Sequence, residues 1–141
     1  MSYLLDTSVV SELRKPDADT RVLSWYGTVR PADLYISVLT IGEIRRGVER
    51  LRRRDPLQAV RLERWLTGLN VGYRDRIVGV DASIAEEWGR INVPDPLPVV
   101  DGLLAASAIV RDWTLVTRNV RDVKRCGVRL LNPFEPRAAE D

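Results

Sequence analysis

The chain has 141 residues, 45% of them hydrophobic, which suits one domain with a buried core. Its 22 basic and 20 acidic side chains nearly cancel, which excludes a protein that coats nucleic acid through overall charge. The absence of histidine excludes a Ser-His-Asp triad and a histidine-ligated zinc site, and the single cysteine, Cys126, excludes an intramolecular disulfide, so carboxylates and a bound metal remain as the available chemistry.

Short apolar runs alternate with longer stretches of helical periodicity, which predicts one α/β domain with a small, mostly parallel sheet. In chain order, the predicted strands are residues 3–5, 34–37, 76–80, 115–117 and 128–131. The first strand runs into a short helix that ends near Leu13, and residues 20–26 form the next predicted helix.

Residues 40–54 are predicted to form a helix that begins at Thr40. Its apolar side chains fall three, seven and ten positions after the first, a stripe that faces the core: Ile41, Ile44, Val48 and Leu51. Asp55 and Pro56 are an N-cap followed by a proline at the first helical position, which predicts a second helix running toward Gly68.

In the second half of the chain, Asp81 is predicted to cap a helix over residues 82–90. Three prolines within residues 92–99 predict an extended loop. Residues 101–112 are apolar nearly all round, which predicts a buried helix that begins at Asp101. The domain is expected to span residues 1–134, and the polar segment 135–141 is expected to be a flexible C-terminal tail.

Asp6 follows the first strand and precedes Thr7 and Ser8, which places a carboxylate and two hydroxyls at the carboxyl end of a strand. Open α/β sheets bind ligands at this edge. The alternative is that Asp6 or Ser8 only caps the short helix that follows.

Two further carboxylates stand at predicted helix starts. Glu43 lies off the core stripe and shares a face with Gly47, which leaves space beside it for a metal-bound phosphate. Its alternative role is in a capping box with Thr40. Asp101 opens an apolar helix, where a buried ionised carboxylate needs a partner; its alternative role is an N-cap.

The loop after strand 115–117 places Thr117, Asn119 and Asp122 at the same edge, unless it is only a solvated loop. Carboxylates ~4 Å apart repel by ~4 kcal/mol per pair at an effective dielectric of about 20, so we expect a cation between them. An all-oxygen ligand set favours Mg²⁺ or Mn²⁺ over zinc. Such ions lower the pKa of a bound water for attack on a phosphodiester.

Five motifs carry a resemblance to a known family: LLDTSVVSEL from Leu4, SVLTIGEIRRGVERL from Ser37, VVDGLLAASA from Val99, LVTRNVRDV from Leu115 and LLNPF from Leu130. With them, roughly residues 3–134 resemble the PIN-domain nucleases, and among these the VapC-type toxins of bacterial toxin–antitoxin pairs, including the FitB-like branch.

The resemblance implies a PIN-domain-like α/β/α sandwich and a metal-dependent endoribonuclease held off by a cognate, VapB-like antitoxin. It also implies a homodimer, and a heterotetramer or larger assembly with the antitoxin. The family's metal-binding acids fall on Asp6, Glu43 and Asp101, and its supporting hydroxyl falls on Thr117.

The chain departs from the family at one position. Many relatives have a fourth acid directly after the Thr-Arg pair, where this chain has Asn119, with Asp122 three residues further on. Asn119 brings no negative charge to a second cation. One prediction is that Asp122 holds that ion, directly or through water, while Asn119 orients water. The alternative is that Asp122 is a surface residue and the site works with three acids and Asn119.

The stretch 45–54 holds six arginines against Glu49 alone, on the helix that carries Glu43. A phosphate chain running alongside the acids would use them, unless they form only a solvated helix face. The candidate RNA contacts are Arg45, Arg46, Arg50 and Arg118. The four tryptophans are expected to be core or interface anchors.

The predicted function is therefore a Mg²⁺-dependent endoribonuclease toxin that leaves 5′-phosphate and 3′-hydroxyl ends. One alternative is a catalytically silent module that binds RNA or antitoxin. Another is a phosphatase with an aspartyl nucleophile, although such enzymes usually have an Asp two residues after the first, where this chain has Ser8. Without a run of ~20 apolar residues or a signal peptide, the protein is expected to be soluble and cytoplasmic.

Overall fold

The computed structural model describes residues 1–136 and places five parallel strands in one sheet, in the order β3-β2-β1-β4-β5. The strands are β1 (Tyr3–Leu5), β2 (Leu34–Ser37), β3 (Ile77–Val78), β4 (Thr114–Val116) and β5 (Leu130–Leu131). The first two match the predicted ranges, β4 begins and ends one residue earlier than predicted, and β3 and β5 are shorter than predicted. The expected parallel sheet is confirmed.

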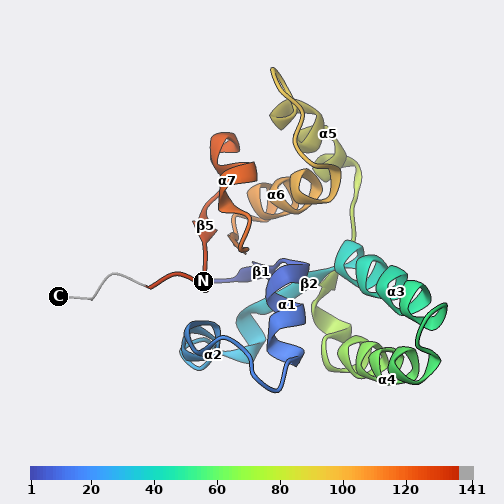
Figure 1. Ribbon diagram of the computed structural model, residues 1–141. Helices are drawn as coiled ribbons and strands as arrows, with labels where there is room; N and C mark the ends of the chain where they lie inside the picture. Colours follow the sequence, from blue (N-terminus) through green and yellow to red (C-terminus); the bar gives the residue numbers. More distant parts are fainter. Residues whose placement is uncertain (137–141) are drawn as a thin grey trace.

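Helices cover both faces of this sheet (Figure 1). They are α1 (Thr7–Arg14), α2 (Thr20–Tyr26), α3 (Val38–Arg52), α4 (Pro56–Gly72), α5 (Ala82–Ile91), α6 (Val99–Arg111) and α7 (Val120–Val123). Single 3-10 turns lie at Pro31–Asp33, Arg74–Arg76 and Lys124–Cys126. The predicted α/β/α sandwich is confirmed.

Two hydrophobic cores separate the layers. Leu5 packs into the core shared with α1 to α4, whereas Leu4 packs into the core shared with α5 to α7. Successive side chains of a strand point to opposite faces, so each strand contributes to both cores. The central strand β1 is thereby fixed between the two helical layers, and the residue that follows it has a well-defined position.

Two helices begin earlier than the sequence predicts. α3 begins at Val38, because the Ser37 side chain caps it by accepting a hydrogen bond from the Leu39 N–H at 3.0 Å. Thr40 therefore lies inside the first turn, and the capping-box role of Glu43 is wrong. α6 begins at Val99, and the Pro98 carbonyl accepts its first hydrogen bond, from the Gly102 N–H at 2.8 Å. Asp101 is consequently in the first turn and is not an N-cap.

The other predicted caps are confirmed. Asp55 accepts a hydrogen bond from the Gln58 N–H at 3.2 Å, and Asp81 accepts one from the Ile84 N–H at 3.0 Å. α4 continues to Gly72, four residues beyond Gly68, because a glycine within a helix lowers its stability without ending it.

The end of the domain is partly described. Phe134 is buried in the core, and Glu135 and Pro136 are exposed. The rest of the predicted tail, residues 137–141, lies outside the described residues, so the flexible tail stays a prediction. Within residues 1–136, the helices are all too short or too polar to cross a membrane.

Candidate active site

The carboxyl ends of the neighbouring strands β1 and β4 bring Asp6 and Thr117 together. The Thr117 hydroxyl donates a hydrogen bond to Asp6 Oδ2 at 2.8 Å, and the Ser8 hydroxyl donates to the same oxygen at 2.9 Å. The Thr7 N–H donates to Oδ1 at 2.7 Å, so Asp6 does cap α1. Three donors therefore fix this carboxylate, which is only 5% exposed.

Glu43 reaches the same edge from α3. The Thr7 hydroxyl donates a hydrogen bond to Glu43 Oε1 at 2.6 Å, and Thr40 Oγ1 lies 3.1 Å from the Thr7 oxygen. A hydroxyl carries one proton, so the Thr40 hydroxyl is the donor in the second bond. Thr7 thus holds Glu43 beside Asp6 by joining the start of α1 to α3.

Asp101, in the first turn of α6, is the least compensated of the predicted acids. Its pKa is raised from 3.8 to about 6, first by burial and then by the negative charges of Asp6, Asp122 and Glu43, in that order. No cation contributes to this shift. Asp6, Glu43 and Asp122 therefore lie close enough to Asp101 for their charges to repel its carboxylate.

Asp6, Glu43, Asp101 and Asp122, here called the acid cluster, do not form a closed cage. Within residues 1–136, no three carboxylate or thiol side chains come close enough to hold a metal ion in their present positions. In chemistry the cluster does fit a hard divalent cation, because it is all oxygen and lacks neutralising charge. Binding therefore requires side chains to move toward the ion.

The segment that carries Asn119 and Asp122, the two candidates for the fourth acid position, forms the start of a short helix and not the predicted loop. Asn119 precedes α7, and its N–H donates a hydrogen bond to Thr117 Oγ1 at 3.0 Å. Asp122 lies in the first turn of α7, where its N–H donates to the Asn119 carbonyl at 3.2 Å. Both side chains are exposed. Asp122 is the one whose charge acts on Asp101.

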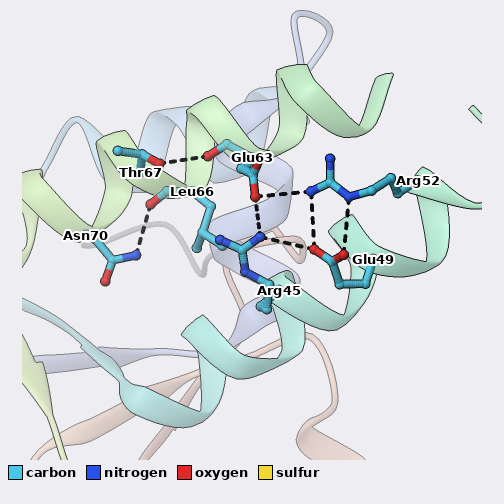
Figure 2. A network of polar contacts seen from close by, with 7 residues as sticks. All are labelled: Arg45, Glu49, Arg52, Glu63, Leu66, Thr67 and Asn70. Atoms are coloured by element: carbon cyan, nitrogen blue, oxygen red, sulfur yellow. Dashed lines mark hydrogen bonds and ion pairs between the residues drawn. The ribbon is translucent and has the colours of Figure 1, made fainter. Parts of the chain in front are cut away.

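The predicted RNA contacts divide into two groups. Arg45 forms an ion pair with Glu49 of its own helix, at 3.1 Å, and another with Glu63 of α4 (Figure 2). Arg52 bonds the same two carboxylates, at 3.2 and 3.1 Å. Glu63 is therefore a second acid that faces the arginines, next to Glu49. Arg45 is exposed but held in ion pairs, and its contact with RNA stays a prediction.

Arg46 and Arg50 are exposed and form no ion pair within the described part of the chain. The Arg118 guanidinium stacks 4.2 Å from the centre of the Phe134 ring, while the Arg118 N–H lies 3.5 Å from Ser8 Oγ. This places Arg118 beside the acid cluster.

Sequence reasoning did not identify Thr40 as a site residue. It is fully buried and joined to Thr7. Its position three residues before Glu43, on one side of a helix, was the available signal. The tryptophans follow expectation: Trp25 is buried and Trp113 stacks on Tyr35 with ring centres 4.2 Å apart.

Fold and site together define an α/β/α protein with a carboxylate cluster at the carboxyl edge of a parallel sheet. Residues 3–127 match the family model of the PIN domain, and the chain belongs to the PIN-domain family.

Similar proteins support this assignment and confirm the resemblance to FitB-like and VapC-type proteins. The chain is 30% identical to the toxin FitB of Neisseria gonorrhoeae over 139 residues, covering 93% of this chain and 97% of FitB. It is 28% identical to the VapC ribonuclease Y4jK of Sinorhizobium fredii, covering 94% and 98%. The solved structure of FitAcB from N. gonorrhoeae superimposes with a TM-score of 0.84 at 28% identity, covering 95% and 99%.

Proposed function

We propose that this protein is the toxin of a toxin–antitoxin pair and cleaves RNA with Mg²⁺ or Mn²⁺ in the cytoplasm. The observation that carries the proposal is the acid cluster, in which Asp6, Glu43 and Asp122 place negative charge near the half-buried Asp101 and no cation offsets their effect on it. Relatives over nearly the whole chain are named toxin and ribonuclease. Asp6, Glu43, Asp101 and Asp122 would hold the ion or ions.

When bound, the metal would lower the pKa of a water molecule and stabilise the leaving oxygen of the phosphodiester. The protein's own residues position the ligands. Thr7 orients Glu43, while Ser8 and Thr117 orient Asp6. The Asn119 backbone N–H donates a hydrogen bond to the Thr117 hydroxyl, and that hydroxyl donates its own proton to Asp6. The side-chain amide of Asn119 takes no part in these bonds and would orient water.

The same cluster suggests how the activity is held off. An acidic site with exposed arginines at its margin is suited to an antitoxin segment that offers an Arg to the carboxylates in place of the metal. We also propose a homodimer and a heterotetramer or larger assembly with the antitoxin. The toxin should therefore lose activity in an equimolar complex with the antitoxin encoded beside it.

The geometry disfavours an aspartyl nucleophile. Such enzymes usually have a second Asp two residues after the nucleophile, whereas this chain has Ser8 there, whose hydroxyl donates a hydrogen bond to Asp6 Oδ2 at 2.9 Å. A silent binding module would have no need for four repelling acids at one edge.

Sequencing of 5′ ends in total RNA after incubation with purified protein tests the proposal. New 5′-phosphate ends should appear with Mg²⁺, and should be absent with chelator and with Asp101→Asn. Cleavage that persists in chelator, or that the Asp101→Asn protein performs equally, would contradict it.

A further inference from the structure

Helix α3 presents three distinct faces, because successive residues of a helix are turned by about 100°. One face carries Ile44 and Val48, which are buried in the core. A second carries Arg45, Glu49 and Arg52, whose charges are paired with one another and with Glu63 of α4 (Figure 2). The first face is therefore buried, and the second is exposed but has its charges paired within the protein.

The third face begins at the acid cluster. Arg46, Arg50 and Arg53 follow Glu43 at offsets of three, seven and ten residues, the spacing of one helical stripe. Arg53 is the C-cap and has helical backbone angles, so it continues the stripe. All three arginines, here called the arginine track, are exposed. They form no ion pair within residues 1–136, unlike their neighbours on the second face.

Gly47 keeps this face open. It lies four residues after Glu43 and three before Arg50, and a Cβ added there would meet no atom within 4 Å. A ligand can therefore approach the helix backbone between Glu43 and Arg50. At 1.5 Å per residue, the distance along the helix from Glu43 to Arg53 is about 15 Å.

We propose that the arginine track binds the phosphates of single-stranded RNA and leads the strand to the acid cluster. This inference rests on the proposed nuclease function. Guanidinium groups suit phosphates because their planar fork donates two parallel hydrogen bonds. The track ends at Glu43, so its ligand must be a polyanion that also delivers one group to the acids, as an RNA strand does.

The ion pairs on the second face explain why only some arginines of α3 take part. Arg45 and Arg52 already form ion pairs with Glu49 and Glu63. A phosphate that bound these arginines would replace the carboxylates and add little new attraction. The basic segment is thus divided by structure into arginines that join α3 to α4 and arginines that face the ligand.

The test measures the affinity of a short fluorescein-labelled single-stranded RNA as a function of salt, in chelator and in the Asp101→Asn background. One protein carries Arg46→Ala, Arg50→Ala and Arg53→Ala. The control carries Arg61→Ala, Arg64→Ala and Arg74→Ala, which remove equal charge from exposed positions elsewhere. Log affinity falls with log salt, and loss of three phosphate contacts should make this fall shallower by about 2. The loss of affinity relative to the parent protein should therefore be roughly 100-fold greater at 0.1 M salt than at 1 M salt.

The control should keep most of its affinity and salt slope. Equal losses in both triple variants would overturn the track, because they would show an effect of net charge alone. Unchanged RNA binding, with loss of binding to a poly-glutamate peptide, would identify a surface for an acidic protein and would also overturn it.

A separate cleavage assay distinguishes this inference from the proposed function. If wild-type protein cleaves RNA and the Arg46/Arg50/Arg53 variant cleaves it equally at low substrate concentration, the track is wrong and the nuclease stands. If wild-type protein does not cleave RNA but binds it through these arginines, the track stands and the nuclease is wrong.

Discussion

Two glutamates on one helix, Glu43 and Glu49, have opposite electrostatic surroundings. Glu49 lies between Arg52 and Arg45, whose hydrogen bonds hold its pKa below the ordinary value. Among residues 1–136, Glu43 accepts a side-chain hydrogen bond from the Thr7 hydroxyl alone, and its charge raises the pKa of Asp101. One carboxylate is neutralised within the protein, while the other contributes to a surplus of negative charge.

This difference separates structural charge from functional charge. Ion pairs that are complete within the chain join α3 to α4 and leave nothing to bind a ligand. The acid cluster is incomplete, since repulsion among its members opposes folding unless a cation or a proton relieves it. The following substitutions break one region while leaving the other intact.

The largest effect is expected for Asp101→Asn. The variant keeps the size and shape of the side chain but removes a charge that the proposed metal needs, so RNA cleavage should fall below detection while the protein remains folded. Asp95→Asn, in the exposed loop before α6, is the matched control and should keep full activity. Gel assays with circular dichroism measure both properties. An active Asp101→Asn protein would show that the cluster is not catalytic.

The next effect concerns the hydroxyl that holds Glu43. Thr7→Val removes the 2.6 Å hydrogen bond at nearly constant volume, and loss of such a supporting bond typically weakens metal affinity by about 10–100-fold. Thr7→Ser keeps the hydroxyl and should restore most of the affinity. Titration calorimetry with Mn²⁺ provides the measurement. Equal affinities for Thr7→Val and wild type would remove Thr7 from the site.

A smaller effect distinguishes the two candidates for the fourth position. Asp122→Ala should weaken cleavage more than Asn119→Ala and raise the Mg²⁺ concentration needed for half-maximal rate, because only Asp122 carries charge. Asn119→Asp should keep or strengthen metal binding. If Asp122→Ala retains the wild-type rate and metal response, the site works with three acids and Asn119.

The smallest effect is expected in the paired region. Glu63→Ala breaks the ion pairs with Arg45 and Arg52, and exposed ion pairs contribute little to stability. The melting temperature should fall slightly, and cleavage and metal affinity should not change. A strong loss of cleavage would mean that the paired region acts on the acid cluster, against the distinction drawn above.

Much of the site was predictable from local pattern. Asp6 follows an apolar strand, and the carboxyl edge of a parallel sheet is where such a residue meets others. The position of Glu43 was also correct, although α3 begins at Val38 and not at Thr40. A helix extended backward keeps the same faces, so Glu43 stays off the core stripe wherever the cap lies.

Other features depend on contacts that sequence spacing does not reveal. Glu63 meets Arg45 across two helices and 18 positions of sequence, so the commitment of Arg45 to α4 had no local signal. The sequence predicted that the helix begins at Asp101, whereas Pro98 is its N-cap and the Pro98 carbonyl accepts the first hydrogen bond. Asp122 was predicted in a loop, and the structure places it in α7. This helix has four residues, which is too short to show a helical pattern in the sequence.

The pH dependence of stability follows from the raised pKa of Asp101. Its pKa is about 6 in the folded protein and 3.8 in the unfolded reference, so between these values the folded state binds more protons. Stability in the absence of metal should therefore fall as pH rises through this window and remain low above it. A cation should relieve the same repulsion at neutral pH and raise the melting temperature by mass action.

The most direct measurement is thermal denaturation of wild type and Asp101→Asn from pH 4 to pH 8, in chelator and with Mg²⁺ or Mn²⁺. In chelator, the melting temperature of wild type relative to the variant should fall as pH rises through about 6, and the metal should restore it only in wild type. Parallel curves for the two proteins, with no response of wild type to either metal, would contradict an acid cluster that requires a cation.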